Sequence, residues 1–162
     1  MLKPASLAEL KAELQTLPQE ELLALCLRLA RFKQDNKELL SYLLFEAADT
    51  DGYTAQVQQA ISEGFAQVNT STVFFAKKSI RKILRQVNKV ARYAANKEME
   101  VALHLHFLQE LLQLPHHITH STVVDKMAHT QHQKISKLIK GMHEDLQYDY
   151  KRRLQLIMET YV

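Results

Sequence analysis

The scarcity of turn-forming residues is the feature that most limits what this chain can fold into. Its 162 residues include three Gly and three Pro, the two residues that most often interrupt regular structure. Leu, Ala, Gln, Lys and Glu, which favour helices, dominate the rest. The β-branched residues are scattered, and no stretch alternates between apolar and polar residues as a half-buried strand would. The sequence therefore predicts an all-α protein.

Capping residues and prolines divide the chain into eight predicted helices. Ser6 with Glu9 forms a capping box at the first helix, Asn96 caps the sixth, and Pro115 ends it. The predicted helices cover about residues 7–17, 18–33, 35–48, 54–67, 72–95, 97–114, 122–140 and 144–161. A chain of this length suits one domain with a core of its own, so we expect a single domain over residues 1–162.

The eight helices pair into antiparallel helical hairpins of about 40 residues, which is close to the period of HEAT-type repeats. No sequence motif recurs at that period, so a short HEAT-like superhelix and an irregular helical bundle both fit. The helix predicted near residues 98–114 is apolar around most of its circumference. A helix of this kind belongs at the centre of a core.

One predicted helix carries an unbroken row of positive charges. Residues 64–97 contain eight Lys and Arg residues and no Asp or Glu. At about 100 degrees per residue, six of these cations fall within an arc of roughly 100 degrees. We call this set the basic stripe: Lys78, Arg81, Lys82, Arg85, Lys89 and Arg92. Ile80, Leu84 and Val87 lie on the opposite side, so the stripe is predicted to face outward while the helix packs on the core.

Two kinds of partner suit such a stripe, an acidic protein surface or the phosphate backbone of a nucleic acid. Alternatively, carboxylates of the same chain neutralise it, from the acidic N-terminal region or from Glu144, Asp145 and Asp149. A membrane surface does not suit it, because the apolar side of the helix is needed for the core and carries no Trp. We therefore predict an interaction module that works through the basic stripe.

The histidines suggest a competing function. All eight lie between His104 and His143. His116, His117 and His120 follow Pro115 in a predicted loop, where three imidazoles can converge on one ion. The alternative prediction is therefore a metal-binding protein that uses these three side chains. Histidines that are simply exposed or hydrogen-bonded between helices fit the same spacing.

The sequence contains no motif that defines an enzyme active site. It has no Gly-x-Ser-x-Gly elbow and no glycine-rich phosphate loop. An active site assembled from distant residues leaves no such motif, so the sequence leaves enzymatic activity open while favouring a non-enzymatic role. We expect no cofactor.

Cys26 is the single cysteine, and it lies among Leu23, Leu27 and Leu29. We predict a buried, inert thiol at this position. The N-terminus lacks an apolar signal core, and no apolar run approaches the ~20 residues needed to cross a bilayer. We therefore expect a cytoplasmic location and no membrane partner.

Several segments resemble a family of small all-helical bacterial proteins that has no assigned function. They are the opening from Leu10 to Leu25, Glu38-Leu-Leu-Ser-Tyr-Leu, Ile80-Arg-Lys-Ile-Leu-Arg and Phe107-Leu-Gln-Glu-Leu. The resemblance implies a helical fold over most of the chain and assigns no catalytic residue. The leucine spacing of the first two helices also resembles that of the DNA-binding SAP modules, although the glycine-containing link of those modules is missing here.

Overall fold

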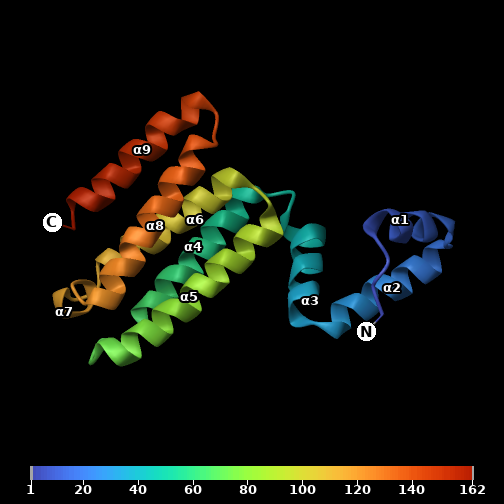
Figure 1. Cartoon of the computed structure of the whole chain (residues 1–162), viewed down its shortest axis with the longest axis horizontal. Helices are drawn as coiled ribbons and strands as arrows, with labels where there is room; N and C mark the ends of the chain where they lie inside the picture. The colour runs from blue at the N-terminus through green and yellow to red at the C-terminus, as the bar shows by residue number, and fades with distance from the viewer. Residues whose placement is uncertain (1, 162) are drawn as a thin grey trace. The chain divides into compact units, whose positions relative to one another are not determined.

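The computed structural model describes residues 2–161 and confirms the predicted all-α fold (Figure 1). The described residues form nine α-helices and no strand. The helices are α1 (Leu7–Thr16), α2 (Gln19–Phe32), α3 (Gln34–Ser41), α4 (Thr50–Ala66), α5 (Val73–Ala94), α6 (Lys97–Leu112), α7 (His116–Thr119), α8 (Thr122–Lys140) and α9 (Glu144–Glu159). We expected one domain. The chain divides into two compact units: the N-terminal unit ends at Phe45, and the C-terminal unit begins at Glu46.

The N-terminal unit consists of α1, α2 and α3, followed by a π-helical segment, Tyr42–Glu46, that reaches the next unit. The predicted capping box is present, because the Ser6 hydroxyl accepts from the Glu9 backbone N–H while the Glu9 carboxylate accepts from the Ser6 backbone N–H. None of the three α-helices contains a buried residue. The prediction that Cys26 is buried is therefore wrong, since its side chain is exposed. Leucine neighbours in the sequence do not bury a thiol when those leucines lie at the surface themselves.

The start of α4 differs from the prediction. We expected the Asp49-Thr50-Asp51-Gly52 cluster to be a turn before a helix at Thr54. Instead, the Asp49 carboxylate accepts from the Gly52 backbone N–H at 2.9 Å and caps α4 one turn earlier. Gly64 also does not interrupt this helix. A Cβ atom at Gly64 would lie 3.2 Å from Cγ1 of Ile83, so the glycine allows α4 and α5 to approach closely.

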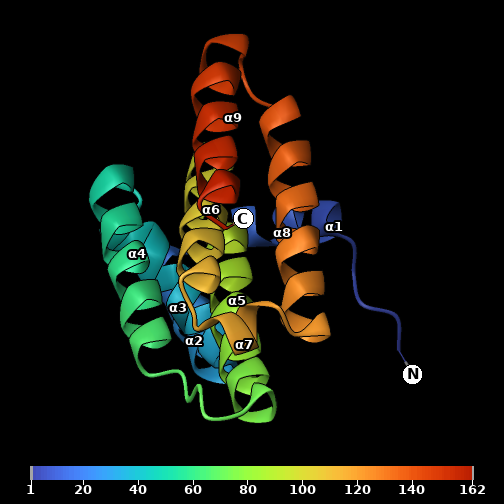
Figure 2. The same ribbon diagram turned by 90° about the vertical axis from the view of Figure 1, so that its left-hand side faces the viewer.

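The C-terminal unit is built around α6, which packs against α4, α5, α8 and α9 (Figure 2). Eight of its sixteen residues are buried, and they cover about two thirds of its circumference at about 100 degrees per residue. The predicted central position of this helix is therefore confirmed. In a repeat stack each unit contacts only its neighbours, whereas here one helix serves as the core for four others. This packing matches the irregular bundle of the two architectures that the sequence allowed.

The core of the C-terminal unit joins all of its long helices. Phe107 of α6 is fully buried and meets Phe65 of α4 edge to face, with ring centroids 5.3 Å apart. Tyr150 and Leu154 of α9 belong to the same core. These contacts fix the positions of α4 and α5, the two helices that carry the surface described next.

Candidate functional site

Helix α5 holds the basic stripe, and its sequence explains both its ends and its orientation. Thr72 caps the N-terminus by accepting from the Phe75 backbone N–H. Ala95 ends the helix in the left-handed conformation, at φ 48°. Asn96 then caps α6 as predicted, by accepting from the Met99 backbone N–H at 3.0 Å. Four residues of α5 point into the core: Ala76, Ile80, Val87 and Ala91. The opposite side of the helix must therefore face solvent.

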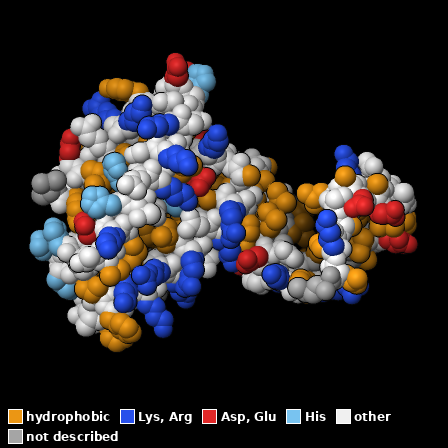
Figure 3. All heavy atoms as spheres, viewed as in Figure 1, with side chains coloured by type: hydrophobic (Ala, Val, Ile, Leu, Met, Phe, Trp, Pro, Cys, Tyr) orange, Lys and Arg blue, Asp and Glu red, His pale blue; other side chains and the backbone are white. Residues whose placement is uncertain are grey.

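The structure exposes the basic stripe as the sequence predicts. Lys78, Arg81, Lys82, Arg85 and Arg92 are exposed, and Lys89 is partly buried. In the space-filling view, blue side chains gather over α5 (Figure 3). From Lys78 to Arg92 the stripe spans about 21 Å at 1.5 Å per residue. Several positive charges therefore lie in one row on a rigid element.

The exposed cations of the stripe are not neutralised within their own unit. None of the five exposed side chains, Lys78, Arg81, Lys82, Arg85 and Arg92, forms an ion pair with a carboxylate within residues 46–161. Of the carboxylates on the last helix that were considered as partners, Asp145 lies 3.3 Å from Nδ1 of His143. Internal pairing is thus not what the structure shows for these five side chains.

An exposed aromatic ring lies beside the first turns of the stripe. Phe74 is 65% exposed, and the Lys77 ammonium lies 5.3 Å from the centre of its ring. Phe74, Lys78, Arg81 and Leu84 line one shallow depression of 570 Å³. The depression thus combines cations with the apolar side chain of Leu84 and an exposed aromatic ring.

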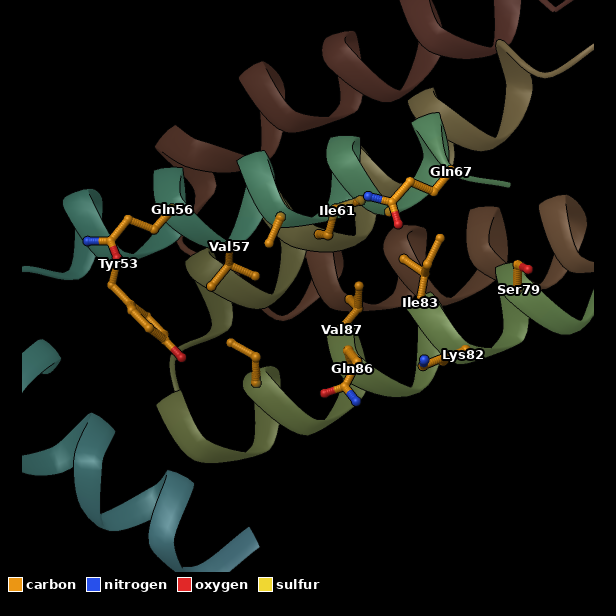
Figure 4. Close-up of a pocket in the computed structure, with 13 residues that line it drawn as sticks. Tyr53, Gln56, Val57, Ile61, Gln67, Ser79, Lys82, Ile83, Gln86 and Val87 are labelled. Atoms are coloured by element: carbon orange, nitrogen blue, oxygen red, sulfur yellow. The ribbon is translucent and has the colours of Figure 1, made fainter. Parts of the chain in front are cut away.

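On its other side the stripe borders a groove between α4 and α5 (Figure 4). The groove has a volume of 580 Å³, and Lys82 contributes to its rim. Val57 and Ile61 of α4 face Ile83 and Val87 of α5 across it. Polar groups at its edges come from Gln56, Gln67, Ser79 and Gln86. No sequence pattern indicates this groove, because it depends on the spacing between two helices.

The three histidines of the metal prediction do not converge in the structure. His116 and His117 belong to the short helix α7 rather than to the predicted loop, and His120 follows it. The His116 and His120 rings stack with centroids 3.7 Å apart, whereas His117 Nε2 donates to the Thr70 carbonyl at 2.8 Å. Within residues 2–161, no group of three His, Cys, Asp or Glu side chains is arranged to hold a metal ion. This geometry favours the basic stripe as the candidate site.

The fold also brings together Ser62, His106 and Glu110, three residues with the types of a hydrolase triad. The Ser62 hydroxyl donates to Glu110 Oε1 at 2.7 Å, and its oxygen lies 2.8 Å from His106 Nε2. Because the hydroxyl proton points to Glu110, His106 Nε2 acts as the donor toward Ser62. A general base must instead accept that proton. The cluster is a set of side-chain hydrogen bonds that joins α4 to α6.

Within the part of the chain that the structure describes, no helix has the length and apolar character needed to cross a membrane. The fold and the stripe together define an all-α protein with a row of exposed positive charges on one helix. Comparison of the chain with protein-family models, with curated proteins and with solved structures found no match.

Proposed function

We propose that the C-terminal unit binds single-stranded nucleic acid through the basic stripe of α5. The observation that carries this proposal is the row of five exposed cations without a carboxylate partner in residues 46–161. Each cation that neutralises a phosphate releases condensed counterions, so a row of them gives salt-sensitive affinity for a polyanion. The stripe lies on a helix fixed by the core, which keeps the charges in one line.

The aromatic ring at the start of the stripe supports a nucleic acid rather than an acidic protein as the partner. Proteins that bind single strands combine a positive track for the backbone with aromatic faces on which bases stack. Phe74 offers such a face, and Lys78 and Arg81 line the same depression. An acidic protein surface would satisfy the cations and leave this ring without a role.

A single strand also fits better than a duplex. The bases of a duplex are stacked on one another and cannot stack on Phe74 without being unpaired. Reading a base pair in the major groove requires side chains that project from a helix seated in that groove. Helix α5 instead lies against α4 and α6, with one side of it available. We therefore assign the stripe to backbone binding with little sequence preference.

The test is a binding titration with a fluorescent single-stranded oligonucleotide at low salt. The Arg81→Gln/Lys82→Gln/Arg85→Gln variant removes three central charges of the stripe. We expect its affinity to fall by roughly 100-fold at low salt, because three phosphate contacts are lost. Its thermal stability should stay nearly unchanged, since these side chains are exposed and unpaired.

The matched control is the Lys126→Gln/Lys137→Gln/Lys140→Gln variant. It makes the same change in net charge with exposed cations of α8. We expect its affinity to stay within a few-fold of the wild-type value. Equal losses in the two variants would mean that net charge, and not the stripe, drives binding. No binding by the wild-type protein would overturn the proposal and leave an acidic protein as the partner to test.

A further inference from the structure

The N-terminal unit exposes apolar surface that a small domain with a core of its own would bury. Among residues 2–45, Tyr42 is the one that is buried. Orange side chains accordingly gather over this unit in the space-filling view (Figure 3). Units of about 40 residues rarely fold without a disulfide, a metal or association with another chain. Cys26 is exposed and is the single cysteine, so a disulfide within the chain does not provide that support.

Helix α2 shows this exposed apolar surface most clearly. At about 100 degrees per residue, its leucines, Cys26 and Phe32 cover an arc of roughly 220 degrees. Contacts within the unit cover only part of this arc, and Leu22 and Ala30 are the residues they shield most. Leu25, Leu29 and Phe32 form one continuous stripe along the helix that is 39%, 60% and 77% exposed. We call these three residues the apolar stripe. Their spacing of four and three residues is that of a helix that packs against another helix.

We propose that the apolar stripe binds a second copy of the same chain, so that the α2 helices of two protomers pair in antiparallel fashion about a two-fold axis. A two-fold interface uses the same patch on both subunits, so the patch must complement itself. The charges of α2 meet this condition, and they set the orientation of the pair.

Acidic and basic residues lie toward opposite ends of α2. Glu21 is in its first turn and Arg28 in its second half, and at about 100 degrees per residue both flank the same side of the apolar stripe. In an antiparallel pair about a two-fold axis, this side of one helix lies beside the same side of the other, with the first turn of one next to the second half of the other. Glu21 of each protomer then lies beside Arg28 of its partner, and the helix dipoles also run in opposite directions. A parallel pair would place like charges side by side.

The exposed apolar area of the N-terminal unit, summed over all its faces, is comparable to one side of a standard interface. Thirteen large apolar side chains of residues 2–45 are at least 37% exposed, and these include Leu7, Leu43 and Phe45. Counting about 100 Å² of apolar area for each fully exposed side chain, their exposed fractions add to roughly 800 Å². A stable interface of standard size takes about 800 Å² from each partner. Leu23 and Leu27 lie on the side of α2 opposite Leu25, so the α2 pair covers the part of this area that lies beside the apolar stripe.

The first test is the mass of the full-length protein in solution, measured by light scattering during gel filtration. We expect twice the chain mass of 18.7 kDa. The Leu29→Glu/Phe32→Glu variant should lose the dimer and show the mass of one chain, because it places charges in the interface. Both side chains are more than half exposed in the single chain, so the single chain tolerates the charges. The control is Leu156→Glu in α9, which is 54% exposed and should remain dimeric.

The second test uses Cys26, which lies at the middle of α2 and therefore near the proposed two-fold axis. A short bis-maleimide should link two chains through this one cysteine, and Cys26→Ser should abolish the product. A monomeric wild-type protein would overturn the proposal. So would a dimer that persists in the Leu29→Glu/Phe32→Glu variant, or one that does not crosslink through Cys26. None of these outcomes depends on nucleic-acid binding, which involves α5.

Discussion

At the scale of single residues, His104 is the most unusual ionisable group of the core. It has no exposed surface, and its Nδ1 lies 2.8 Å from the Gln131 side-chain oxygen. With that oxygen accepting, Nδ1 carries the hydrogen and Nε2 is an unprotonated acceptor. Nε2 has no hydrogen-bond partner within the described residues. The sequence showed His104 and its position on α6, but a neutral, buried imidazole follows only from the packing of α8 against that helix.

This imidazole should make the stability of the protein depend on pH. Burial and the positive charge of Lys134 lower the pKa of His104 from 6.5 to about 4. As the pH falls, the unfolded chain binds the proton first, so the stability is present above pH 6.5 and is lost toward pH 4. The loss from this residue should be about 3 kcal/mol, at 1.36 kcal/mol per pKa unit. Denaturant unfolding at pH 7.5 and pH 4 measures it.

The control for this prediction is His104→Leu, which removes the titrating group. The variant should lose about 3 kcal/mol less than the wild type over the same pH range, whatever its stability at pH 7.5. Equal losses in the two proteins would show that the pKa of His104 is the same in the folded and unfolded states, which would contradict this prediction.

Phe107 tests the core directly. It is fully buried at the centre of the C-terminal unit and contacts Phe65. Phe107→Ala should lower the free energy of unfolding by ~3–5 kcal/mol, because it removes apolar contacts and leaves a cavity. The denaturation midpoint measures this change. An unchanged midpoint would mean that α6 is not the core helix.

At the scale of elements, the sequence predicted helix ends well where a side chain forms the cap. Ser6 and Asn96 cap α1 and α6 as expected, because a cap depends on residues within one turn. The prediction of a turn at the Asp49-Thr50-Asp51-Gly52 cluster was wrong, since an Asp before a Gly suits a turn as well as a helix start. Helix α7 has four residues, too few to show a periodic pattern. The exposure of the apolar residues of α2 could not be predicted, because a row of apolar residues on a helix does not show whether another part of the same chain packs against it.

The junction between α5 and α6 stores local strain that a substitution can release. Ala95 has φ 48°, a conformation that costs a residue with a side chain roughly 1–2 kcal/mol. Ala95→Gly should raise the free energy of unfolding by about 0.5–1 kcal/mol, after the greater freedom of glycine in the unfolded chain is taken into account. Thermal unfolding measures the gain. Ala94→Gly, one residue earlier and still helical, should have the opposite sign, and a loss of stability in both variants would contradict this account of Ala95.

At the scale of the whole molecule, the basic stripe was predictable and its surroundings were not. The stripe follows from charge spacing on one helix, and the structure exposes five of its six cations. The depression beside Phe74 and the groove beside Lys82 depend on how side chains from several turns and helices meet. The same holds for His117, whose bond to the Thr70 carbonyl joins segments 47 residues apart. Patterns within one helix carry no information about such contacts.

The salt dependence of binding tests the central claim most directly. For a single strand, the logarithm of the affinity should fall with the logarithm of the salt concentration at a slope of about −0.7 per phosphate contacted. Five exposed cations therefore predict a slope of roughly −3 to −4 for the wild-type protein, and Arg81→Gln/Lys82→Gln/Arg85→Gln should reduce its magnitude by about 2. The variant with three neutralised lysines of α8 should keep the wild-type slope. A slope near zero, or the same slope in all three proteins, would contradict the assignment of the basic stripe to a nucleic-acid backbone.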